Sequence, residues 1–297
     1  MAQSDSVLLT PDLNGRSVEA ALYTASDGDH TQLDQSINGR LVPLQKSDTH
    51  VLSESPSGRT TETVVRKYDA TGALASTERT VTDEQKSPNG SVIHATIYRS
   101  DLNGNFQESE RRLIESQTQG ATTTSNVTIS KPGLGGSLEV AEKRNIVTTV
   151  EANTTRETEV VQRLAQSGQF VDATRQVREE TKAGNKMTTN TAIYEPDFDG
   201  RMSLSRQQVE TTTKAPDGSA VTERNTYAPA PYGIARDDRG GSKLLEQEVI
   251  VRHEKNGGVT ETTTVSRPTI SDPNLPGPST VVSDLVCTGK CLGPLQP

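Results

Sequence analysis

Tryptophan is absent from this 297-residue chain, and aromatic residues make up only 3% of it. Hydrophobic residues contribute 30%, and the mean hydropathy is −0.64. A chain of this composition cannot fill a thick hydrophobic core. No run of about 18 apolar residues occurs either, so the sequence predicts no membrane-spanning helix.

Catalytic and metal-binding patterns are missing as well. The four histidines share no spacing suited to a metal, and there is no nucleophile elbow, phosphate-binding glycine loop or His-Glu-Xaa-Xaa-His motif. We therefore predict that the protein is not an enzyme and uses no cofactor. An enzyme of unrecognised type is the alternative, because active sites assemble from residues far apart in sequence.

Only two cysteines occur, Cys287 and Cys291, separated by three residues that include a glycine. This spacing suits a small disulfide loop in an oxidising compartment, which we predict, whereas a zinc site would need two further ligands. No apolar segment typical of a signal peptide follows Met1. We expect a secreted or cell-surface protein.

The net charge is −8, from 31 basic and 39 acidic residues that are mixed along the chain. A nucleic-acid-binding protein would carry a basic stripe with aromatic platforms, so we predict no nucleic-acid partner. A 16-stranded outer-membrane barrel would need outward-facing apolar residues in alternation and aromatic girdles. Neither is visible, so the sequence also predicts no membrane insertion.

Glycine recurs at intervals of 32 or 33 residues, at positions 39, 72, 104, 136, 168, 200 and 233. A second series falls about half a period later, from Gly58 to Gly257, with Ala152 and its neighbours in the one vacant place. Glycine and asparagine accept the positive φ of tight turns, so each period reads as two antiparallel strands. Threonine-rich runs such as Thr122-Thr123-Thr124 favour strands.

Columns at fixed distances from these glycines predict the faces of the strands. Large apolar residues stand two positions later, small residues five, basic residues seven and apolar residues nine, as in Phe106, Ser109, Arg111 and Leu113 after Gly104. Positions five, seven and nine should share one face, since strand side chains alternate. The sequence predicts an all-β protein of antiparallel β-hairpins with a period of about 32 residues. We expect a long curved or spiralled meander of about 14 to 16 strands, with a β-propeller as the alternative fold and disorder as the competing interpretation.

The pattern divides the chain into five parts. Residues 1–32 are an atypical capping unit, 33–227 regular hairpins, 228–240 an inserted loop, 241–267 the last hairpin, and 268–297 a proline-rich linker and tail. Inserted loops often carry binding residues, so Tyr227, Tyr232, Asp237 and Asp238 are candidates for a carbohydrate- or protein-binding site. The turns that begin Asp101-Leu102-Asn103-Gly104 also resemble the start of calcium loops, which leaves calcium as an alternative ligand there.

The segment Tyr68-Asp69-Ala70-Thr71-Gly72-Ala73-Leu74 resembles the signature of YD-repeat proteins of the Rhs and teneurin type. That resemblance implies β-hairpins wound into one extracellular sheet, and it transfers no functional residue. Together these observations predict a non-enzymatic structural or binding protein. Its partners would be itself, another extracellular protein or a polysaccharide, and Ser279–Val286 would add to a neighbouring copy's sheet edge in head-to-tail assembly.

Overall fold

The structure is a computed structural model, and it describes residues 2–11, 17–26, 29–37, 40–69, 71–101, 103–229, 242–255, 258–269 and 275–287. These residues form one sheet of 18 strands. The strands are β1 (Ala2–Pro11), β2 (Ser17–Ser26), β3 (His30–Ile37), β4 (Arg40–Ser55), β5 (Gly58–Tyr68), β6 (Leu74–Ser87), β7 (Gly90–Ser100), β8 (Phe106–Gln119), β9 (Thr122–Pro132), β10 (Leu138–Glu151), β11 (Thr154–Leu164), β12 (Phe170–Ala183), β13 (Lys186–Pro196), β14 (Met202–Lys214), β15 (Ala220–Pro229), β16 (Ser242–Lys255), β17 (Gly258–Pro268) and β18 (Pro276–Cys287).

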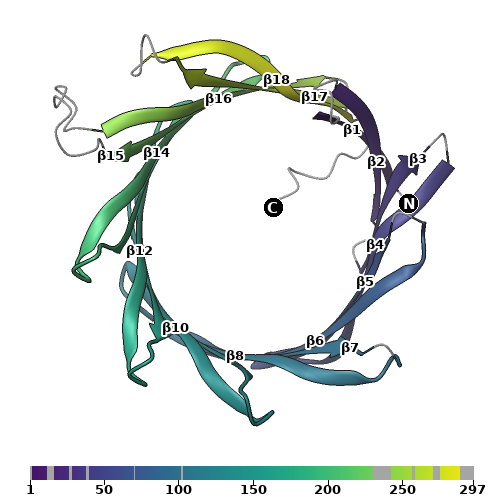
Figure 1. The fold of residues 1–297 in the computed structure, drawn as a ribbon, viewed down its shortest axis with the longest axis vertical. Helices are drawn as coiled ribbons and strands as arrows, with labels where there is room; N and C mark the ends of the chain where they lie inside the picture. The colour runs from purple at the N-terminus through teal and green to yellow at the C-terminus, as the bar shows by residue number, and fades with distance from the viewer. Residues whose placement is uncertain are drawn as a thin grey trace.

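Each strand pairs antiparallel with the next strand in sequence, from β1 to β18. The sheet curves into a ring around a central opening, and β18 comes to lie beside β1 (Figure 1). The prediction of an all-β antiparallel meander is confirmed. The ring closes where β18 lies beside β1, instead of spiralling (Figure 1). The sheet has 18 strands instead of 14 to 16 and is not divided into the blades of a propeller.

Closure of the ring also determines where the last strand, β18, pairs. The predicted addition of Ser279–Val286 to a neighbouring copy is wrong, because this segment belongs to β18, which pairs with β17 and lies against β1 of the same chain. Within the described ranges no helix has the length and apolar character needed to cross a membrane.

Two kinds of turn mark the two ends of the ring. At one end, here the wide-turn end, five residues join β5 to β6, β7 to β8, β9 to β10, β11 to β12 and β13 to β14. At the other, the tight-turn end, two residues join β6 to β7, β8 to β9, β10 to β11 and β12 to β13, while β14 and β15 are joined by five.

The wide turns explain the first glycine series. In the β7–β8 turn the Asp101 carboxylate accepts hydrogen bonds from the N–H groups of Asn103 and Asn105 at 2.8 and 2.9 Å, and Gly104 follows with φ of 81°. Asp69 and Asp197 play the same part in their turns. These backbone hydrogen bonds, that from Asn105 above all, hold the pKa of Asp101 below its usual value. Calcium at these turns stays a prediction.

A β-bulge recurs near the wide-turn end. Ile97 pairs with Glu110 while Tyr98 pairs with Glu108, which leaves Ser109 as the extra residue, and its hydroxyl donates to the Ile97 carbonyl at 3.1 Å. Ala141, Ala173 and Ser205 occupy the equivalent places on β10, β12 and β14. The column of small residues is therefore the bulge position. The prediction that positions five, seven and nine share a face is wrong for position five, because the bulge residue leaves the alternation, whereas positions seven and nine do share a face.

Alternate residues of each strand face the opening. On β9, Val127 and Ile129 are buried while Asn126, next to Val127, is exposed. Side chains crowd together on the concave face of a curved sheet, so we take the face of Val127 and Ile129 as the inner one. The strand pairings place Ile97, Thr189 and Thr263 on the same inner face. Most of the buried layer in the described residues thus lies on the wall of the opening, while Leu244 and Ser266 are buried on the outward face.

Candidate functional site

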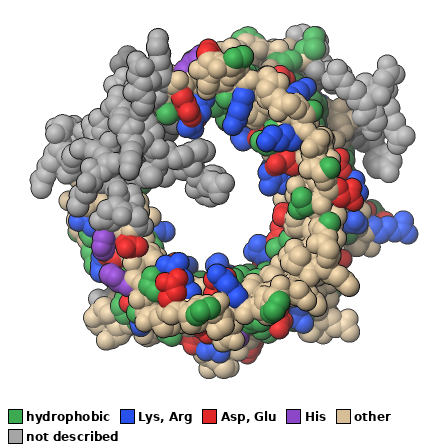
Figure 2. Space-filling model, turned by 180° about the vertical axis from the view of Figure 1, so that it is seen from behind, with side chains coloured by type: hydrophobic (Ala, Val, Ile, Leu, Met, Phe, Trp, Pro, Cys, Tyr) green, Lys and Arg blue, Asp and Glu red, His purple; other side chains and the backbone are tan. Residues whose placement is uncertain are grey.

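The opening of the ring is the candidate site. Seen end-on, Lys and Arg side chains and Asp and Glu side chains border it together (Figure 2). We call the inner face of the sheet the lumen wall. Charged groups of both signs occur along it, and many of them fall into two clusters on neighbouring strands.

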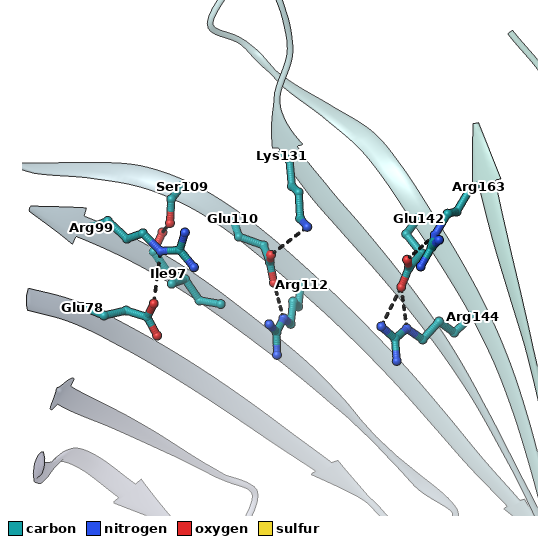
Figure 3. A network of polar contacts seen from close by, with 10 residues as sticks. All are labelled: Glu78, Ile97, Arg99, Ser109, Glu110, Arg112, Lys131, Glu142, Arg144 and Arg163. Carbon is teal, nitrogen blue, oxygen red and sulfur yellow. Dashed lines mark hydrogen bonds and ion pairs between the residues drawn. The ribbon is translucent and has the colours of Figure 1, made fainter. Parts of the chain in front are cut away.

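The first cluster runs from β6 to β11 (Figure 3). Arg99 contacts Glu78 at 3.2 Å, and Glu110 is held between Arg112 on its own strand and Lys131 at 3.6 Å. Four further members form the most connected part: Glu142 lies 2.6 Å from Arg144 and 3.1 Å from Arg163, and Arg144 also reaches Glu159 at 3.2 Å. The carboxylates are the more buried partners, since the side chains of Glu110 and Glu142 are only 14% exposed.

The second cluster runs from β14 to β17. Arg224 lies between Glu210 at 2.8 Å and Glu248 at 2.5 Å, so one guanidinium joins three adjacent strands. Arg267 pairs with Glu246 at 2.9 Å, and Arg252 pairs with Glu254 at 2.9 Å and Glu261 at 3.7 Å. Each arginine is held by cross-strand or same-strand carboxylates, so the wall presents charges of both signs to the opening.

Sequence reasoning missed these clusters, although a signal for them exists. Residues two apart on a strand share a face. Opposite charges two apart occur as Glu110 with Arg112 and as Glu142 with Arg144, and both pairs are ion pairs on the lumen wall. Between the charges the wall is aliphatic, as where Ile114 stands opposite both Ile93 and Val127. The long aliphatic stems of the arginines can pack against such residues.

The outward face is polar too. Asn145 donates to Asn126 at 2.9 Å, and Arg156 lies 2.6 Å from Glu179. Near the wide-turn end, basic side chains sit over aromatic rings at 4.6 to 5.9 Å; the pairs are Lys46 with Tyr68, Arg79 with Tyr98, Lys143 with Phe170 and Arg175 with Tyr194. The large apolar residues that stand two positions after the glycines are not buried on this face: Leu74 is 57% and Phe106 43% exposed.

The predicted site residues are only partly within the described chain. Tyr227 lies at the end of β15, half-buried, and pairs with Gln207 and Leu244 on the outward face. Tyr232, Asp237 and Asp238 of the 228–240 loop lie outside the described residues, as does Cys291. Cys287 ends β18 opposite Val259. The binding role of the loop and the disulfide stay predictions.

No protein-family model matches the chain, and no curated protein matches it in sequence. Among solved structures it is similar to an anion-selective porin from Comamonas acidovorans, with a TM-score of 0.53 and 6% identity over 96% of this chain and 97% of that one. The chain has a porin-like fold. A second match is OmpF from Salmonella typhi, solved in complex with daunomycin. The match covers 96% of this chain and 94% of the OmpF chain at 10% identity, but its TM-score of 0.47 adds nothing to that conclusion.

The porin-like fold corrects four predictions. The resemblance to YD-repeat proteins is wrong, because the Tyr68-Asp69 segment is one turn of a closed porin-like sheet. The secreted, self-assembling structural or binding protein is overturned with it. The partners predicted for that protein are withdrawn too. The exclusion of membrane insertion also fails, because it rested on rejecting the architecture that the chain adopts. Composition misled the prediction: the chain closes its sheet without the outward apolar alternation on which that rejection depended.

Proposed function

We propose that this chain forms a water-filled channel through which small hydrophilic solutes and ions diffuse, and that it is not an enzyme. The observation that carries the proposal is the closed ring with charged side chains on its inner wall (Figures 2 and 3). The likeness to an anion-selective porin supports the same reading of the fold. A channel of this kind belongs in a cell envelope, where solutes cross a barrier.

The lumen wall fits solute passage better than tight binding. The first cluster has one more basic than acidic side chain, and the second has two more acidic than basic ones. Taken together the two clusters are nearly neutral, so the wall has no strong preference for either sign of ion. Ion pairs that are this exposed contribute little to stability, about 0–1 kcal/mol each, and they keep the wall wetted. Passage without strong selectivity is therefore the expected behaviour of the wall itself.

The outward face carries charged residues that would make membrane insertion costly if they faced lipid. Charged residues facing lipid at the midplane of a bilayer cost about 2–4 kcal/mol for Arg or Lys. Arg156 and Glu179 lie on this face, although they neutralise one another at 2.6 Å. Insertion and conduction therefore have to be measured separately.

The test uses two neighbouring residues of β9. Ser125 faces the lumen and the exposed Asn126 faces outward. We would prepare Ser125→Cys and Asn126→Cys, each with Cys287 and Cys291 replaced by serine, and reconstitute them in planar bilayers. A bulky thiol-reactive reagent should reduce the unitary conductance of Ser125→Cys and leave that of Asn126→Cys unchanged.

Insertion is measured in parallel, by flotation of the protein with vesicles after a urea wash. Protein that floats but never conducts would refute the channel. Protein that stays in the aqueous fraction under every condition would refute membrane insertion. Equal block of both cysteine variants would contradict the assignment of the inner face.

A further inference from the structure

A cavity of about 750 Å³ lies at the tight-turn end, between the β12–β13 turn and the end of β14. Its lining includes Lys182, Lys186 and Lys214 together with Asn185 and Met187. Met187 pairs with Lys182 on one side and with Thr212 on the other, which places these three side chains on the inner face. The cavity therefore stands at one mouth of the opening.

Lys182 and Lys214 give this cavity a basic character from the inner face, and Lys186, whose place in the strand alternates with that of Met187, lines it at the turn. All three side chains are exposed, and none of them forms an ion pair with another described residue. The one carboxylate in the lining, Glu180, is already paired with Arg178 at 3.1 Å. The chain as a whole has a net charge of −8, whereas the two inward lysines of this cavity have no carboxylate partner among the described residues.

The turns hold the lysines near one another. The Asn185 side chain donates to the Lys214 carbonyl at 2.7 Å, and the Lys214 N–H donates to the Asn185 carbonyl at 3.0 Å. These two hydrogen bonds tie the β12–β13 turn to the end of β14. The lining thus has a hydrogen-bonded backbone frame that carries exposed, charged side chains.

We propose that this cavity binds small multivalent anions, phosphate- or carboxylate-bearing solutes, at the mouth of the channel. The proposal rests on the channel function for its role in passage, but the binding itself does not depend on membrane insertion. A lysine ammonium acts as a compact point charge with three donors, which suits a solute with several negative oxygens. An open site at a mouth would concentrate such solutes without holding them long.

The experiment measures binding of pyrophosphate and of citrate to the full-length protein by titration calorimetry at low ionic strength. Lys182→Gln combined with Lys214→Gln should weaken the binding of pyrophosphate at least about tenfold, since each lost charge-assisted hydrogen bond is worth a factor of this size. The matched control is Lys67→Gln combined with Lys143→Gln, which removes the same charge from strands outside this cavity. The control should bind as the parent does.

The two probes separate the sources of the anion. Binding of both supports a general site for multivalent anions, and binding of pyrophosphate alone narrows the proposal to phosphates. Equal affinity in the parent and the Lys182/Lys214 variant, or equal loss in the control, would overturn it. A variant that conducts like the parent yet has lost binding would show that the channel function stands independently. Binding by a protein that never conducts would leave the site in place and remove the channel.

Discussion

Removing Arg224 tests how far the paired charges of the lumen wall contribute to the stability of the ring. This arginine, 33% exposed, contacts Glu210 on β14 at 2.8 Å and Glu248 on β16 at 2.5 Å. Arg224→Gln deletes both ion pairs and leaves two carboxylates facing each other across one strand. We expect the variant to unfold at lower urea concentration than the parent.

The magnitude follows from the geometry. Two partly exposed ion pairs contribute about 0.2–1 kcal/mol each. The two carboxylates are then separated by about two strand spacings, roughly 9.6 Å. Their repulsion is about 0.4 kcal/mol in water and about 1.7 kcal/mol at an effective dielectric constant of 20. The total loss in the free energy of unfolding should be roughly 1–4 kcal/mol.

The assay is urea unfolding, with the midpoint as the readout and the slope expected to stay constant. A triple variant that also carries Glu210→Gln and Glu248→Gln removes the repulsion, so it should recover much of the loss. Arg178→Gln is the matched control, because Arg178 has a single carboxylate partner, Glu180, in the described part of the chain. No change in the midpoint of Arg224→Gln, or a triple variant as unstable as the single one, would refute the reasoning.

Three further variants test the turns and the inner layer. Ala152 has φ of 38° in a tight turn, so Ala152→Gly should raise the free energy of unfolding by about 0.5–1 kcal/mol in urea titrations, and a decrease would contradict the strained turn. Replacing Ile129, which is 7% exposed, by alanine should lower the free energy of unfolding by about 2–3 kcal/mol. An unchanged urea midpoint would show that the inner layer is not packed. Asp101→Ala should lower the thermal midpoint at neutral pH. Because the pKa of Asp101 is depressed in the folded state, its contribution to stability is present above the ordinary pKa and is lost as the pH falls through the folded value. The thermal midpoints of parent and variant should therefore converge in acid. A difference between the midpoints that stays constant with pH would contradict this account.

The local structure was readable from the sequence because it depends on neighbours in the chain. Asp101 and Gly104 define a turn by their own hydrogen bonding and φ, and the strands between such turns follow from threonine and alternation. The vacant place in the second glycine series proved to be a turn with Ala152 in the left-handed region.

Closure was not readable, because it depends on small changes summed over all 18 strands. The column of small residues that includes Ser109 was visible in the sequence, but a small residue alone does not predict a β-bulge. Once the bulge is placed, Phe106 and Arg111 fall on the same outward face, although a step of five positions would put them on opposite faces of a regular strand. The ion pairs of the wall then follow from residues such as Glu142 that contact two strands at once.

The uniform pairing of each strand with its successor has a consequence for how the width of the opening is set. A segment of 32 residues, such as the one from Gly104 to Gly136, spans one outgoing and one returning strand. Losing or duplicating such a segment leaves every other turn intact and changes the circumference by two strands. The width of the opening can therefore change in steps of one hairpin, by tandem duplication or by loss of such a segment.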